Sequence, residues 1–332
     1  MKRIILIIVI VLNISTLFSQ TVFDALKTTQ TEISGTARYM GLAGAFGALG
    51  GDASAIKDNP AGLGIFRKSE ITGTMDVLMQ THKSDWNVLK ANNNLYKVGF
   101  NNFSYVAVVP TWRSESGYNG LQSSNFSFSY NKLKNFNRQM NIQGGASSSS
   151  MTDYFANFTK KLSNNELEYD NYPTSKYSSV FDNVSIPWMS AMAHYGRLIG
   201  VVNDSTGNFL GWGSVLDKDE KITPSYTLEE LGSVNEYSFG WSGNFSNRFF
   251  VGATINLQSI YYQADSKYSE NFEKGGNMLL DNRIITEGTG VNFKLGAIVV
   301  PVDFIRFGAS IQTPMLYSLN LYNSGILNFN SS

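Results

Sequence analysis

Two stretches of the chain alternate between apolar and polar residues, a pattern typical of β-strands with one apolar and one polar face. In 236–246 the odd-numbered residues are Tyr, Phe, Trp, Gly and Phe, and the residues between them are mainly Ser, Gly and Asn. A turn at 246–248 leads into 249–258, which alternates in the same way. The pattern predicts an antiparallel hairpin with Phe239, Trp241 and Ile255 on its apolar face.

A second hairpin is predicted from 291–299 and 305–312, which are joined by a turn and place Phe307 on the apolar face. Weaker alternation predicts further strands at 70–80, 96–109, 125–132 and 316–323. Between 132 and 236 the alternation fades, and this stretch is predicted to be mostly a long extracellular loop with a short helix near 187–198. About eight strands can therefore be predicted.

The first 19 residues have the pattern of a secretory signal peptide. Lys2 and Arg3 precede the apolar run 4–12, and Ser19 stands at a plausible cleavage position. The run is too short to span a bilayer, which takes about 20 residues, so a retained anchor is the less favoured alternative. The chain has no cysteine, which excludes disulfides, thiol catalysis and a lipid attached through cysteine.

Composition favours a membrane barrel over the soluble β-sandwich that alternation alone leaves open. Aromatic residues make up 13% of the chain. Charged residues make up only 16%, whereas soluble domains contain about 25%. Many aromatic and small polar residues suit a wall with interfacial aromatic girdles and a polar interior. The formal net charge is zero, which gives no reason to expect nucleic-acid binding.

The segment 20–66 is rich in glycine and alanine and precedes the first predicted strand. Gly41, Gly44 and Gly47 are spaced by three, which does not fit the nucleotide-binding pattern G-x-G-x-x-G after a strand. Asp52 is predicted to cap a short helix through about Lys57. Asn59-Pro60 should then end that helix, because a residue before proline avoids helical geometry. Small residues here suit a backbone that packs closely against a wall.

Two stretches carry a family resemblance. The run from Ser34-Gly35 through Asn59-Pro60-Ala61 resembles the N-terminal hatch of the FadL family of outer-membrane transporters for hydrophobic compounds. The stretch from Gly296 to Pro314 resembles a second part of that family, in particular the branch often labelled hemin receptor.

The resemblance implies an all-β fold, a transmembrane antiparallel β-barrel of 14 strands whose lumen is plugged by a small N-terminal hatch. It implies a monomer in the bacterial outer membrane that passively takes up hydrophobic small molecules such as long-chain fatty acids, with no cofactor, metal or enzymatic activity. The hatch and gating residues it implies are Gly35, Arg38, Gly41, Gly44, Gly47, Asp52, Asn59, Pro60 and Ala61.

The predicted organisation is a signal peptide at 1–19, a hatch at 20–66 and a transmembrane barrel at 67–332. With about eight strands and no closing aromatic strand, the barrel is expected to be incomplete and the chain to be part of a longer protein. Two other functions stay open, a barrel component of a protein secretion system and a lipase-like outer-membrane enzyme. His82 and His194 are far apart in sequence, and Glu229-Glu230 has the pattern of solvated loop charges.

Overall fold

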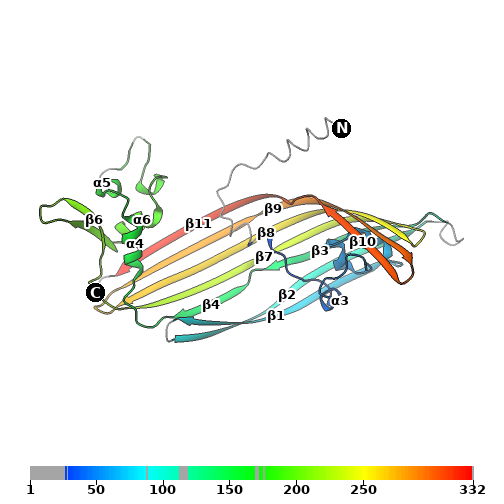
Figure 1. The fold of residues 1–332 in the computed structure, drawn as a ribbon, viewed down its shortest axis with the longest axis horizontal. Coiled ribbons are helices and arrows are strands. Elements are labelled where there is room, and N and C mark those ends of the chain that lie inside the picture. Colours follow the sequence, from blue (N-terminus) through cyan, green and yellow to red (C-terminus); the bar gives the residue numbers. More distant parts are fainter. Residues whose placement is uncertain are drawn as a thin grey trace.

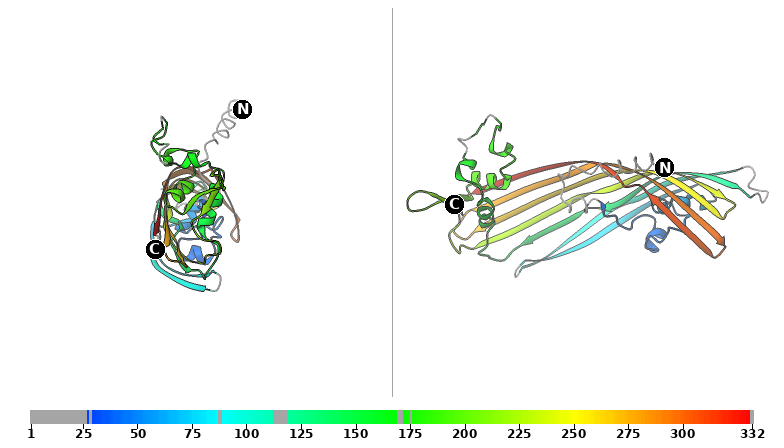
Figure 2. Two further views of the ribbon diagram at one scale, coloured as in Figure 1. Left: turned by 90° about the vertical axis from the view of Figure 1, so that its left-hand side faces the viewer. Right: turned by 45° about the horizontal axis from the view of Figure 1, so that its top comes forward.

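The protein is mostly antiparallel β-sheet. The computed structural model describes Lys27 and residues 29–86, 89–111, 119–168, 172–174 and 176–330. The predicted signal peptide and the first residues of the predicted hatch, 20–26, lie outside the described residues. Nine strands form one large sheet, which curls strongly about its long axis (Figures 1 and 2).

The sheet contains every segment that alternation predicts as a strand. Its strands are β1 (Glu70–Trp86), β2 (Leu89–Pro110), β3 (Leu121–Asn135), β4 (Arg138–Gln143), β7 (Ile222–Phe245), β8 (Phe249–Phe272), β9 (Asn277–Val302), β10 (Ile305–Gln312) and β11 (Leu316–Asn330). β3 and β4 lie end to end beside β7, and β10 and β11 lie end to end beside β9. Within the described residues, β1 has a hydrogen-bonded neighbour on one side only.

The predicted turn between β7 and β8 is confirmed. Ser246 and Asn247 both have positive φ, 53° and 57°, as a type I′ hairpin turn requires. The Arg248 amide donates to the Phe245 carbonyl at 3.1 Å, which closes the turn.

The two faces of the sheet are reversed relative to a water-soluble protein. Large apolar side chains point outward and are exposed: Phe239 is 52% exposed, Ile255 51% and Phe307 64%. On the opposite, inner face, Ser242 and Asn256 are almost fully buried. The predicted alternation is therefore confirmed, and its apolar side is the exposed side.

In the halves of β7, β8 and β9 that lie away from the β7–β8 turn, the two faces exchange character: the inner face is apolar and the outer face is polar. There the inner face carries the buried Ile222, Leu228 and Phe272. The outer face carries polar residues and the cross-strand ion pairs Arg283–Asp265 and Lys267–Asp281. Each long strand thus has one half with an apolar outer face and one half with a polar outer face.

Residues 144–221 form a small subdomain, the cap, at the polar end of the sheet (Figure 1). It consists of α4 (Met151–Thr159), α5 (Asn164–Leu167), η5 (Val180–Asp182), α6 (Trp188–Tyr195) and the hairpin β5 (Ile199–Asn203) and β6 (Phe209–Ser214). Phe155 and Trp212 in its core pack with Phe272 of the sheet. Among the described helices, none is both long and apolar enough to cross a membrane.

The cap corrects the prediction of a long loop between 132 and 236. The predicted helix near 187–198 is α6. The weak alternation left room for strands in this stretch without locating them, and the structure places β4 and the first half of β7 there. The prediction missed the ordered core of the cap, which is anchored where Glu270 of β8 accepts hydrogen bonds from the Ser150 hydroxyl at 2.5 Å and the Met151 amide at 2.7 Å.

Candidate functional site

The N-terminal segment, defined here as Lys27 and 29–66, packs on the inner face of the sheet. It contains α3 (Ala37–Gly41) and two 3₁₀ helices, η1 (Ala53–Lys57) and η2 (Pro60–Ile65). Asp52 caps η1 by accepting from the Ser54 amide at 2.9 Å, so the predicted capped helix is confirmed. η1 ends before Asn59, which in turn caps η2.

Asn59 joins the segment to the sheet. Its side-chain amide donates to the Gly47 carbonyl at 2.7 Å and to the Ala297 carbonyl of β9 at 3.2 Å. Its side-chain oxygen accepts from the Ala61 amide at 3.0 Å. Asn59 is 1% exposed and Ala61 is fully buried, so water does not compete for these bonds. The Asn59 side chain thus fixes the turn at Asn59-Pro60 by bonding to the backbone of the segment and to the backbone of the sheet.

The other residues of the predicted hatch serve its internal structure. The Thr36 hydroxyl donates to the Asp52 carboxylate at 2.7 Å. Arg38 donates to the Gly51 carbonyl at 3.0 Å. Gly35 and Gly44 have positive φ, 145° and 76°, and an added Cβ would strike Ser54 at the first and meet Tyr39 at the second. Gly41 and Gly47 have open space at the Cβ position, so steric contact does not require glycine at either.

A cavity of about 540 Å³ lies between one part of the segment and the inner face. Its lining includes charged residues, Lys57 and Asp58 of the segment and Glu236 and Lys294 of the sheet. The lining also includes the apolar residues Ile33, Leu133 and Val234. Burial raises the pKa of the Asp58 carboxyl and lowers the pKa of the Lys57 ammonium, because both charged forms lose hydration.

The charged groups of the cavity find most of their partners inside the protein. Lys294, 7% exposed, donates to the Lys57 carbonyl, and Lys57 donates to the Ser34 carbonyl. Asp58 accepts from the Tyr39 hydroxyl at 2.7 Å, and Glu236 accepts from Gln258 at 2.9 Å. The sequence does not predict this cluster, because its members are up to 237 positions apart and no local sequence motif marks any of them.

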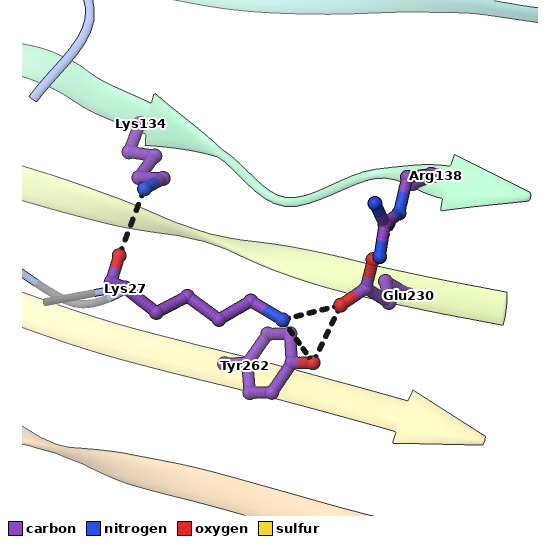
Figure 3. Close-up of polar contacts among 5 residues, drawn as sticks. All are labelled: Lys27, Lys134, Arg138, Glu230 and Tyr262. Atoms are coloured by element: carbon purple, nitrogen blue, oxygen red, sulfur yellow. Dashed lines mark hydrogen bonds and ion pairs between the residues drawn. The ribbon is translucent and has the colours of Figure 1, made fainter. Parts of the chain in front are cut away.

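A second polar cluster ties Lys27 to the sheet (Figure 3). Glu230 of β7, 5% exposed, forms ion pairs with Lys27 and with Arg138 of β4. The Tyr262 hydroxyl donates to Glu230 at 2.6 Å, and Lys134 donates to the Lys27 carbonyl at 2.8 Å. The expectation that Glu230 is a solvated loop charge is wrong, because it lies in a strand and its side chain points inward to three partners.

Glu230→Gln should lower the free energy of unfolding by about 1–3 kcal/mol, because it leaves two cations without their shared carboxylate. The loss stays below that of a fully buried pair, since the side chains of Lys27 and Arg138 are 37% and 44% exposed and water partly replaces the partner. Urea unfolding of the protein in detergent measures it. Glu229→Gln at the exposed neighbouring position is the control, and equal losses in both variants would contradict the structure.

The two histidines lie on separate elements. His82 is on β1, and His194 is on α6, where its ring packs edge-on against Trp212 with ring centres 5.0 Å apart. Among the described residues, no three His, Cys, Asp or Glu are grouped so as to hold a metal ion.

No protein-family model matches the chain, and neither a curated protein nor a solved structure matches it. The resemblance to the FadL family therefore rests on the sequence motifs alone.

Proposed function

We propose that the sheet is part of the wall of a β-barrel in the bacterial outer membrane and that the N-terminal segment is a hatch inside it. The channel passively takes up hydrophobic small molecules such as long-chain fatty acids. The observation that carries the proposal is the exposed apolar outer face. Burying one large apolar side chain is worth about 1.5–3 kcal/mol, so a row of them facing water would be very costly, whereas lipid removes that cost.

The length of the apolar band supports a membrane position. On β7 and β8 it runs over 237–245 and 249–257, close to the 9–11 residues with which a tilted strand crosses a bilayer. Beyond the band, the ion pairs Arg283–Asp265 and Lys267–Asp281 suit water and not lipid. The short β7–β8 turn then belongs on the periplasmic side and the cap outside the cell, as is usual for such barrels.

The cavity supports a ligand with an apolar body and a polar head. Both apolar and charged residues line it, and its wall includes Thr313–Met315, the break between β10 and β11. A groove of about 670 Å³ shares Gln258 and Tyr317 with the cavity and reaches the outward-facing Leu257 and Leu316. A ligand that left through this break would pass from the cavity to lipid without crossing water.

Asn59→Ala and Pro60→Gly should leave the barrel folded but change the uptake of a labelled long-chain fatty acid. Both changes remove anchors of the hatch, the first by deleting the bonds to Gly47 and Ala297. Uptake is measured in cells with equal surface levels of each variant, with the exposed Asn92→Ala of β2 as control. Unchanged uptake in both variants would remove the gating role. Lost surface expression would assign the motif to folding instead.

A further inference from the structure

Three glycines of the sheet lie directly beneath the N-terminal segment. A Cβ added at Gly252 would lie 2.4 Å from the Pro60 carbonyl carbon. One added at Gly296 would lie 1.9 Å from the Asn59 side-chain oxygen, and one at Gly308 would lie 2.2 Å from the Gly47 carbonyl oxygen. Gly252 and Gly296 are also direct partners across β8 and β9. The segment therefore approaches the wall more closely than any side chain would allow.

Strand geometry does not require glycine at these positions. None of the three has a positive φ, and glycine inside a strand weakens it. Gly73 of β1 shows the contrast, because a Cβ there would have no atom within 4 Å. The three strands β8, β9 and β10 thus each carry a residue unfavourable to the strand, at the place where the segment touches the wall.

The glycines also give Asn59 access to the wall. Its side-chain amide reaches the carbonyls of Ala297 and Ala309, at 3.2 and 3.4 Å. A methyl group at Gly296 would overlap the other end of the same side chain, and one at Gly252 would push Pro60 away. Either would displace the turn that the hydrogen bonds hold.

We propose that Gly252, Gly296 and Gly308 form a seat in the wall that sets the resting position of the N-terminal segment. They are positioning residues, because the absence of a side chain at each of them lets the segment lie against the wall. The effect of the seat on transport rests on the function proposed above, but the seat itself is a property of the interface.

The test uses thiol labelling, which the absence of native cysteine makes specific. Leu63→Cys places a reporter at a fully buried position of the segment that faces Gly240 of the wall. In this background, Gly296→Ala and Gly252→Ala should each raise the labelling rate in purified protein about tenfold or more. The added methyl group destabilises the state in which the segment packs on the wall, so the introduced thiol is exposed to the reagent more often. Gly73→Ala should leave the rate unchanged. Unchanged labelling in the two seat variants would overturn the proposal.

A double variant separates the seat from general damage to the strand. Asn59→Ala removes the atoms that a methyl group at Gly296 strikes first, so Gly296→Ala should add little to it. If Asn59→Ala and Gly296→Ala instead raised the labelling rate by factors that multiplied in the double variant, the proposal of a seat would be overturned. Gly308→Ala, on the short strand β10, provides the same measurement where a β8 or β9 variant fails to assemble.

Fatty-acid uptake by the same variants tests the proposed function separately. Faster labelling with unchanged uptake supports the seat and contradicts the gating role. Unchanged labelling overturns the seat whatever the uptake.

Discussion

Ile255→Arg should lower the free energy of unfolding in a bilayer by about 2–4 kcal/mol if the residue lies near the midplane. Ile255 points outward from β8 and is 51% exposed, so in the proposed membrane position the arginine would stand in hydrocarbon. At a water-facing position of a soluble sheet the same change would cost within about 0.5 kcal/mol. Reversible urea unfolding in phospholipid vesicles gives the value.

Ile255→Phe is the matched control, because an outward aromatic side chain suits lipid and meets no tightly packed neighbour; we expect little change. Asn256 is the next residue of β8 and points to the inner face, so Asn256→Arg is an obvious candidate for a second control. The structure makes it unsuitable, since Asn256 is 1% exposed and its side chain donates to Asn292 at 2.8 Å. Equal stability of Ile255→Arg and Ile255→Phe would contradict a lipid-facing wall.

Phe155→Ala should unfold the cap and leave the half of the sheet with the apolar outer face intact. Phe155 is 1% exposed in the cap core, and truncating such a residue costs about 3–5 kcal/mol. The cap core is small, so this is a large part of its stability. Limited proteolysis should then cleave within 144–221, while hydrogen exchange in 237–245 and 249–257 stays slow.

The control for the cap lies on the same helix. Phe158 is 44% exposed on α4, and Phe158→Ala should leave proteolysis of the cap nearly unchanged. Cleavage at the same rate in both variants, or loss of protection throughout the sheet, would show that the cap is not a separate unit of stability.

The sequence predicts the half of the sheet with the apolar outer face well, because one contrast, an apolar outer face against a polar inner face, acts on alternate residues. The prediction fails where that contrast ends. In the far half of β7, outward Thr227 and Glu229 face water while inward Leu228 is buried, so the pattern reverses within one strand. A bulge at Asn101 in β2 shifts the alternation by one residue, which keeps both Phe100 and Phe103 outward.

The candidate site is predicted only where local geometry determines it. The cap at Asp52 and the helix end before Asn59 follow from neighbouring residues and are predicted from the sequence, whereas the cap that Asn59 forms on η2 is not. The cavity charges, the Glu230 cluster and the wall glycines depend on contacts between distant strands. Glycine at 252 or 296 is indistinguishable in sequence from other strand glycines, because its reason is a partner about 190 to 240 positions away.

The length of β7, β8 and β9 has a consequence for where a ligand is captured. These strands have 24 to 26 residues, of which a bilayer needs only about 10. In the membrane position proposed above, at about 3.3 Å per residue and a tilt near 45°, the remainder would raise the cap roughly 30 Å above the lipid surface. A molecule that meets the cap would then come from the aqueous surroundings and not from the outer leaflet. Binding at the cap could affect the cavity only through a conformational change passed along the paired strands β7, β8 and β9.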